Sequence, residues 1–326
     1  MRDIFYVLLY TLGVHHLFRY FNGRSLTVLL YHGVAPDTNQ GIYNYKRKHI
    51  SPEAFKEHLG FIARHYTVLP LDESFRMLRE CTLPCHALAI TFDDGYKNFY
   101  TYALPLLKEF RMPATIFLAS DFVLKKKPLW VDRLEYAIGQ KKLSREERIA
   151  EDSRLRAELK SLPSRECERR LMPIERQIGA TLCDFSDERA VYAPLNASEI
   201  KEMQEIGITI GGHTKSHASL PHLSDPEAAE EIEGSKQVLE EHFGEISKLF
   251  CYPYGRWNLK TEQLVIEAGF SGALTTIEGA NVPGTHPFRL RRFSMDGLED
   301  IKRFAATISG ARLFLRKVTH VRGPAI

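Results

Sequence analysis

Short apolar segments alternate with helix-forming segments along most of this chain, and this alternation restricts the fold more than any other feature. Residues 26–31 (LTVLLY), 88–92 (LAITF) and 114–118 (ATIFL) have the length and the β-branched, apolar composition of buried strands. Between the first two, Ser51 and Pro52 match the capping residue and first-turn proline of a helix. The alternation predicts a parallel α/β architecture, with crossover helices outside the strands.

The second half of the chain continues this alternation. Asn196 and Ser224 are each followed three residues later by glutamate, the pattern of a helix capping box. A helix is also predicted over residues 98–110, with a kink at Pro105 because proline cannot donate a backbone hydrogen bond. Further strands are predicted at residues 208–210, 249–252 and 272–275.

The 326 residues are predicted to form one main domain with two additions. Residues 25–326 contain the strand and helix alternation, and residues 1–24 form a separate N-terminal segment. Residues 125–194, roughly, interrupt the alternation with a stretch rich in Arg, Glu and Lys. We expect this stretch to be a helical insertion, either a cap over the functional site or a solvated excursion.

The N-terminal segment is apolar over residues 4–17, which is shorter than the roughly 20 residues that a spanning helix needs. No small-residue cleavage site follows it. We expect an amphipathic helix that lies either on a membrane surface or on the domain itself. A cell-envelope or membrane-associated location is favoured, and a cytoplasmic one stays open.

Charge and cysteine content exclude two other classes of protein. The formal net charge is only +3 and there is no long basic stripe, so nucleic acid is not an expected partner. An odd number of irregularly spaced cysteines does not form a disulfide framework. The five cysteines are Cys81, Cys85, Cys167, Cys183 and Cys251.

Two adjacent carboxylates, Asp93 and Asp94, directly follow the predicted strand at residues 88–92. Ligands of α/β folds bind at the carboxyl ends of the strands. Neighbouring side chains on an extended segment point in different directions, so one carboxylate can bind a cation while the other faces a substrate. Gly95 allows a sharp turn beneath them. An ordinary Asp-Asp-Gly surface turn is the alternative.

Two histidines, His213 and His217, follow another predicted strand and share a face if the segment is helical. Two imidazoles and one carboxylate make a metal site with open positions, which is typical of catalytic zinc centres. The second aspartate is then available as a general base. Two ordinary surface histidines are the alternative.

Two more strand ends contribute candidate groups. The turn at residues 251–255 (CYPYG) can present a backbone N–H to a developing oxyanion, although an ordinary aromatic turn fits equally well. His32 follows the first strand and can act as a general acid, although a lone histidine is more often structural.

Together these segments resemble the polysaccharide deacetylase family, also called the NodB-homology or carbohydrate esterase family 4 domain. The resemblance runs from about residue 26 to residue 295 and rests most on TFDDG at residues 91–95 and HTKSH at residues 213–217. It implies a distorted, incompletely closed (β/α) barrel. It also implies that Asp93 is the catalytic base, that the Tyr254 N–H is the oxyanion donor, and that a divalent metal, Zn²⁺, is the cofactor. The implied metal ligands are Asp94, His213 and His217.

The chain departs from the family pattern at two places. Cys251 stands where the family has an arginine that orients the base, and the sequence leaves Arg256, Arg291 and Arg292 open as replacements. The family's C-terminal Leu-x-His motif is missing, but residues 30–32 (LYH) have its pattern at the opposite end. This arrangement resembles the circularly permuted branch, which includes poly-N-acetylglucosamine deacetylases, and it implies that His32 is the general acid.

The sequence therefore predicts a metal-dependent hydrolase that removes acetyl groups from N-acetylated polysaccharide. Two alternatives stay open: an O-acetyl polysaccharide esterase that uses the same site, and a non-catalytic carbohydrate-binding protein with a degenerate site. The expected partner is a polysaccharide or oligosaccharide, with possible peripheral membrane association through the N-terminal helix.

Overall fold

The computed structural model describes residues 10–36, 44–179, 182, 191–298 and 300–318. A parallel sheet in the order β10-β1-β5-β6-β7-β8-β9 runs through the middle of the molecule, and β4 pairs with β5 as an eighth strand. Every ladder in this sheet is parallel. The strands are β1 (Thr27–Tyr31), β4 (Thr67–Val68), β5 (Ala87–Phe92), β6 (Thr115–Leu118), β7 (Thr209–Gly212), β8 (Leu249–Cys251), β9 (Gly272–Leu274) and β10 (Phe293–Ser294).

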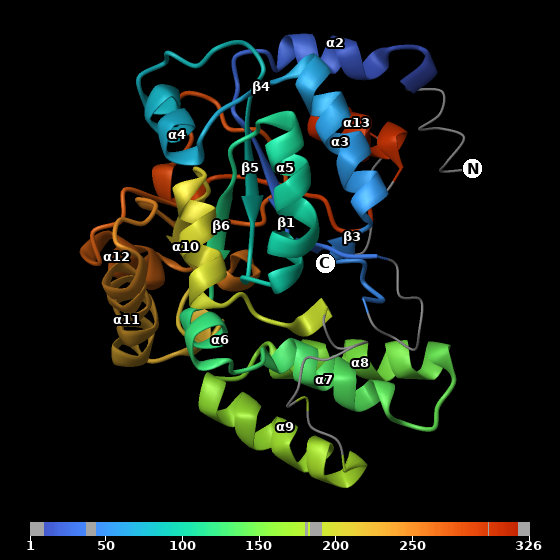
Figure 1. Ribbon diagram of the computed structural model, residues 1–326, viewed down its shortest axis with the longest axis vertical. Coiled ribbons are helices and arrows are strands. Elements are labelled where there is room, and N and C mark those ends of the chain that lie inside the picture. Colours follow the sequence, from blue (N-terminus) through green and yellow to red (C-terminus); the bar gives the residue numbers. More distant parts are fainter. Residues whose placement is uncertain (1–9, 37–43, 180–181, 183–190, 299, 319–326) are drawn as a thin grey trace.

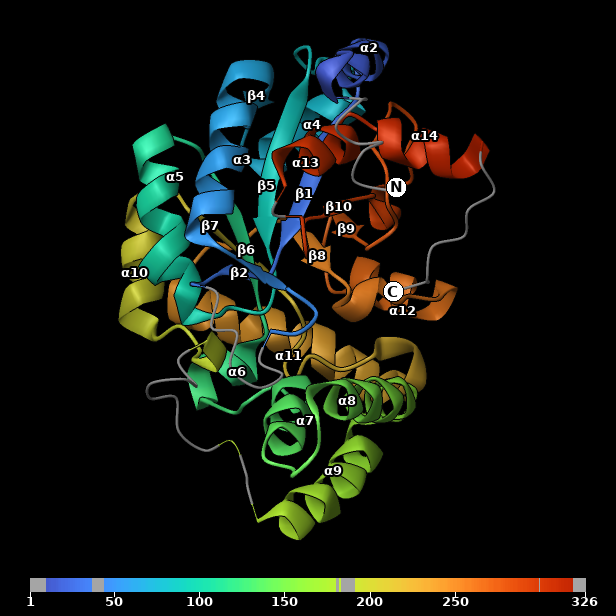
Figure 2. The same cartoon turned by 90° about the vertical axis from the view of Figure 1, so that its right-hand side faces the viewer.

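The sheet curls into a half-barrel, as Figures 1 and 2 show, with β10 and β9 as its two ends. This confirms the expected incompletely closed (β/α) barrel. β1 and β5 are buried along their whole length, which is why both consist of apolar and small polar residues. A separate pair, β2 (Gly33–Val34) and β3 (His49–Ile50), follows the end of β1.

Helices cover the outside of the curled sheet (Figure 1). Their N-termini carry the predicted capping groups: the Ser51 side chain accepts from the Ala54 N–H, and Asn196 and Ser224 form capping boxes. The covering helices are α3 (Pro52–His65), α4 (Leu71–Arg79), α5 (Leu104–Phe110), α6 (Ser120–Lys125), α10 (Ala197–Glu205), α11 (Asp225–Phe243), α12 (Leu259–Glu267) and α13 (Ile301–Ile308).

The helix predicted at residues 98–110 is divided in two. A π-helix at Phe99–Ala103 precedes α5, and Pro105 lies in the first turn of α5. Proline has no N–H for the preceding turn, so the chain takes a wider turn before the α-helix begins.

The described part of the predicted insertion is helical. It contains α7 (Trp130–Gly139), α8 (Arg145–Leu159) and α9 (Ser164–Ile178), and most of residues 180–190 lie outside the described residues. These three helices lie beyond the end of the barrel toward which the β5 arrow points in Figure 1. The insertion therefore lies over the carboxyl ends of the strands, where the candidate site residues are.

Buried ion pairs attach α7 to its surroundings. Asp132 accepts hydrogen bonds from Lys48 at 2.5 Å and from Tyr96 at 2.7 Å. The guanidinium of Arg133 makes two bonds to Glu175 of α9, at 2.9 and 2.6 Å. Because charges this well buried are paired, α7 is held to both the barrel and α9.

The N-terminal segment is described from residue 10 onward. Its helix α2 (Val14–Phe21) contacts α13 and the C-terminal helix α14 (Ala311–Val318), with His15 buried. Leu17, Tyr20 and Phe21 on the same helix are 56%, 76% and 73% exposed. Within the described residues, we find no helix with the length and apolar character needed to cross a membrane.

Candidate active site

Strand register brings the candidate residues together at one edge of the sheet. Tyr31 of β1 pairs with Phe92 of β5, so His32 and Asp93 are the next residues on neighbouring strands. On the other side of β5, β6 separates it from β7, and Leu118 of β6 pairs with Gly212, the residue before His213. Parallel strands end at the same edge, so these side chains face one region although they are far apart in sequence.

Asp94, His213 and His217 form the centre of the site. The Asp94 Oδ1 lies 3.5 Å from the His213 Nε2 and 3.3 Å from the His217 Nε2. All three side chains are at least nine-tenths buried. Their ligand atoms lie within 4.8 Å of one another, which brings together the three predicted metal ligands.

The two imidazoles lie together, but not on the face of a helix. Residues 213–217 are not helical. Thr214 and His217 instead adopt left-handed conformations, with φ of 64° and 58°, and the two histidine rings lie 4.9 Å apart. Asp94 has a φ of 78°, so strained non-glycine backbone is concentrated at this centre, as is common at functional sites.

The hydrogen bonds of the two histidines fit a bound cation. The His213 Nδ1 lies 2.7 Å from the Cys251 carbonyl, which can only accept, so Nδ1 carries a proton and Nε2 is the nitrogen left to bind a cation. The His217 Nδ1 lies 3.0 Å from the Tyr254 hydroxyl, which allows the same tautomer. The two Nε2 atoms both face the Asp94 Oδ1, a buried oxygen with no hydrogen-bond partner among the described residues. One carboxylate oxygen and two imidazole nitrogens around one point, with the Nδ1 atoms of both rings hydrogen-bonded, are the arrangement of a metal site.

A second group with metal-ligating atoms, Asp93, His213 and Cys251, overlaps the first. Both Asp93 oxygens accept from Arg292, and the His213 nitrogen on this side donates to a carbonyl. The first group is therefore the better cation site.

Asp93 is held by Arg292, one of the three arginines that the sequence left open. The guanidinium Nη1 and Nη2 each donate to one carboxylate oxygen at 2.8 Å. Arg292 is itself fully buried, and its Nε donates to the Thr275 carbonyl at 3.0 Å. Burial disfavours the charged form of Asp93, but the charge of Arg292 and its hydrogen bonds outweigh burial and lower the pKa of this carboxyl group.

Cys251 lies beside this pair. Its thiol donates to Asp93 at 3.4 Å and accepts from the Arg292 Nη2 at 3.2 Å. Arg256, a second arginine left open, donates to the Lys160 carbonyl instead. Among the described residues, Arg292 alone of the three arginines therefore reaches Asp93.

His32 is paired with Asp296, a residue that the sequence analysis missed. The His32 Nδ1 lies 3.0 Å from the Asp296 Oδ1. Burial opposes the charged imidazolium, but Asp296, with smaller contributions from Asp94 and Asp93, raises the pKa of His32 to about 9. Leu30 pairs with Ser294 of β10, so His32 and Asp296 leave adjacent strands in register. An acidic residue just past a strand would have been the signal. Because β10 is only two residues long, the sequence does not indicate that a strand precedes Asp296.

Tyr254 lies in the turn after β8 with a left-handed φ of 59°. Its hydroxyl reaches His217, and its ring lies 4.6 Å from the His217 ring. Gly255 follows with a φ of 64°, and a Cβ there would lie 2.4 Å from the Thr276 backbone nitrogen, so only glycine fits. The turn is thereby fixed against the candidate metal ligands.

Comparisons with known proteins identify the family of the chain. The family model described as polysaccharide deacetylase matches residues 81–273, more than half of the chain. The Bacillus subtilis protein YxkH, named as a polysaccharide deacetylase, is 23% identical over 258 residues, which cover 78% of this chain and 66% of that protein. The match thus spans slightly less than two thirds of the length of YxkH.

Solved structures share the fold. The Streptococcus pyogenes deacetylase PplD, solved with acetate, superposes with a TM-score of 0.61 at 19% identity over 87% of this chain and 98% of its own. IcaB from Ammonifex degensii superposes with a TM-score of 0.60 at 21% identity over 87% of this chain and 97% of its own. The chain therefore belongs to the polysaccharide deacetylase family of enzymes.

Proposed function

We propose that this enzyme is a metal-dependent hydrolase that removes acetyl groups from N-acetylated amino sugars in a polysaccharide. The observation that carries the proposal is the meeting of Asp94, His213 and His217 beside an Asp93 that is held by Arg292. Family membership supports deacetylation of a polysaccharide, and the site chemistry supports the finer points of metal dependence and amide hydrolysis.

Asp94, His213 and His217 are the proposed ligands of the metal. One carboxylate and two imidazoles suit Zn²⁺ and leave coordination positions open. A divalent ion held there supplies Lewis-acid charge beside the acetyl carbonyl. The remaining steps belong to side chains and backbone groups of the chain itself.

Asp93 is the proposed general base, which accepts a proton from the water that attacks the acetyl carbonyl. Arg292 keeps this carboxyl group ionised and fixes its orientation through two parallel hydrogen bonds. The backbone N–H of Tyr254 is the proposed hydrogen-bond donor to the oxyanion, supported by the position of its turn against His217.

His32 is the proposed general acid, which protonates the nitrogen of the departing amino sugar. Its pairing with Asp296 favours the protonated imidazole at neutral pH. An amine is a poor leaving group unless it receives a proton, whereas an alcohol from an O-acetyl ester depends on the acid less. The His32–Asp296 pair therefore favours the amide over the O-acetyl alternative.

The test is acetate release from an N-acetylglucosamine oligomer and from an O-acetylated xylan, with and without added zinc. We expect zinc-dependent release, faster from the amide, and loss of turnover in the Asp93→Asn and His213→Ala variants. Release at wild-type rates by either variant would contradict the assigned roles. Sugar binding without any release would favour the non-catalytic alternative.

A further inference from the structure

A pocket of about 510 Å³ lies next to the candidate site, between the insertion and the loop after β7. Tyr254, whose hydroxyl bonds to His217, is part of its wall. Trp130 at the start of α7 forms another part, with its ring 6.4 Å from the Tyr254 ring. The volume is within the usual range of small-ligand sites, about 300–1,000 Å³. A ligand group in this pocket would therefore lie directly beside the reacting centre.

The acidic side chains of the pocket wall are already engaged within the protein. Asp121 pairs with Lys125 at 2.8 Å, and Glu168 pairs with Arg133 at 2.7 Å. Glu231 accepts from the backbone N–H groups of residues 215 and 216 at 2.9 Å and from the Ser216 hydroxyl at 2.6 Å. Of the remaining two, Glu230 pairs with Lys215 and Glu227 caps α11.

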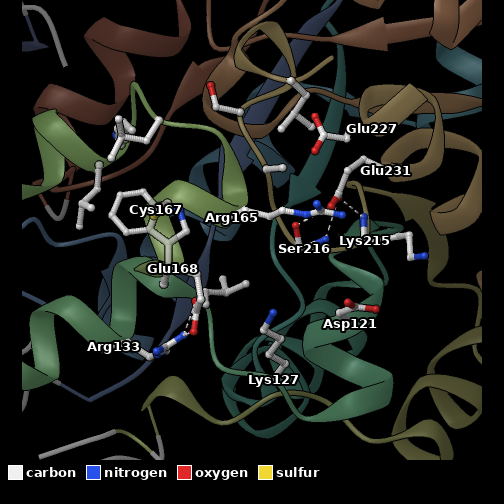
Figure 3. Close-up of a pocket in the computed structure, with 18 of the residues that line it drawn as sticks. Asp121, Lys127, Arg133, Arg165, Cys167, Glu168, Lys215, Ser216, Glu227 and Glu231 are labelled. Carbon is white, nitrogen blue, oxygen red and sulfur yellow. Dashed lines mark hydrogen bonds and ion pairs between the residues drawn. The ribbon is translucent and has the colours of Figure 1, made fainter. Parts of the chain in front are cut away.

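Three basic side chains of the same wall, unlike these acids, have no partner of opposite charge among the described residues. Lys127, Lys160 and Arg165 make no ion pair within the part of the chain that the structure describes. Figure 3 shows Lys127 and Arg165 extending into the pocket from different elements. The pocket thus contains positive charge that the protein does not neutralise by direct contact.

Lys160 is the best placed of the three. It ends α8, and its Nζ lies 4.7 Å from the centre of the Tyr254 ring. Burial and the nearby cations, Lys46 among them, lower the pKa of Lys160 to about 8. An anion bound here would offset the effect of burial and of the nearby cations on this ammonium group. Among the described residues, its side chain contacts the Tyr254 ring, and no carboxylate is paired with it.

We propose that this pocket is a subsite for an anionic substituent on the sugar next to the one being deacetylated, with Lys160 as its main contact. The proposal rests on the proposed function, and it narrows the substrate class to acidic polysaccharides. A sugar carboxylate and a sugar phosphate share the required chemistry. Trp130 and Tyr254 supply aromatic faces at the boundary between the subsite and the reacting centre.

The test compares acetate release from two oligosaccharides of equal length. One contains N-acetylglucosamine alone, and in the other N-acetylglucosamine alternates with glucuronate. We expect kcat/KM at low ionic strength to favour the acidic oligomer by about fivefold, mainly through KM, because one ion pair forms. Lys160→Gln should bring the ratio close to one, and Lys160→Arg should preserve it. Lys56→Gln, on the exposed Lys56–Glu109 pair of α3, is the matched control and should leave the ratio unchanged.

Binding to the Asp93→Asn variant separates this proposal from the catalytic one. The probes are the glucuronate-containing oligomer and glucosamine 6-phosphate, measured by calorimetry with and without Lys160→Gln. Binding of at least one probe that weakens with Lys160→Gln supports the subsite and indicates which anion it prefers, even if the wild type releases no acetate. Binding of neither probe, or binding that does not depend on Lys160, overturns the subsite while leaving any measured deacetylation intact.

Discussion

Where the family has an arginine, Cys251 places a small thiol 3.4 Å from Asp93, and a guanidinium reaches Asp93 from residue 292 instead. Arg292 follows β9 and the turn after it, and it lies just before β10. Asp93, the proposed base, thus has a charged partner that comes from a different position in the chain than the family arginine. A degenerate site would not be expected to retain a buried, bidentate arginine–carboxylate pair of this kind.

Replacing Arg292 by lysine keeps the charge and removes the fork that holds both oxygens of Asp93. We expect kcat/KM to fall about a hundredfold because the base is no longer fixed. The pKa of Asp93 should also rise, which moves the acidic limb of the pH–rate profile to a higher pH. A pH–rate profile measures both effects. Arg291→Lys, on the exposed neighbouring residue, is the control, and an unchanged acidic limb in Arg292→Lys would contradict the positioning role.

Asp296→Asn should move the alkaline limb of the pH–rate profile. The Asp296 charge is the main factor that raises the pKa of His32 to about 9, and a general acid works only while protonated. Without that charge His32 loses its proton at a lower pH, so activity declines earlier as the pH rises. A divalent cation at the proposed site would lower the His32 pKa in both proteins alike, so the difference between them would remain. Asp300→Asn, which preserves the cap of α13, should leave the limb in place.

The sequence predicted part of this site and left part open, for identifiable reasons. Two short motifs, each just past a strand, contain Asp93, Asp94, His213 and His217. Their order and spacing were sufficient to select these four residues from the sequence. Three of the four residues at 289–292 are arginines, and periodicity cannot tell which one points inward. Arg289 is partly exposed and pairs with Glu262, whereas Arg292 is fully buried and pairs with Asp93. That distinction depends on contacts between residues far apart in the chain.

At the scale of elements, the bounds of the strands were easier to predict than the conformation of the segments that follow them. β1 and β5 lie within one residue of the predicted ranges, because buried parallel strands are continuously apolar. β7 extends two residues beyond its predicted end, through two glycines whose strand pairing the sequence could not indicate. The sequence left open whether the segment from His213 to His217 is helical. It is not, and the left-handed conformations that bring the two rings together are set by tertiary context rather than by propensity.

The insertion helices are held by buried charges, and this allows a stability test. Glu175 is only 4% exposed, and it loses its ion-pair partner when Arg133 is replaced by methionine. We expect thermal unfolding to show a loss of about 3 kcal/mol, because a buried charge is left unpaired. Arg154→Met removes a 3.9 Å pair between the exposed Arg154 and the partly exposed Glu158, and it should cost less than about 0.5 kcal/mol. Equal losses in the two variants would show that the buried pair does not anchor α9.

At the scale of the whole molecule, α2 and the insertion lie at opposite ends of the long axis (Figures 1 and 2). The candidate active site lies toward the insertion. If α2 binds a membrane surface through its exposed side chains, the site faces away from the lipid and toward a polymer in solution. This arrangement suits a polysaccharide substrate better than a lipid headgroup.

Replacing Leu17, Tyr20 and Phe21 by serine tests the membrane proposal. These side chains are exposed, so the triple variant should keep its fold. We expect the wild type to sediment with vesicles that contain anionic lipid and the variant to stay in solution, with equal acetate release from a soluble oligomer. A wild type that does not sediment, or a variant that still does, would remove this role from α2.

Metal content measured on the purified, zinc-reconstituted chain tests the central claim most directly. The account predicts about one tightly bound zinc per chain in the wild type and in Asp93→Asn, where the three ligands are intact. It predicts little or none in Asp94→Ala and His213→Ala, provided that circular dichroism shows both to be folded. Folded Asp94→Ala and His213→Ala proteins that retain a full equivalent of zinc would contradict the account.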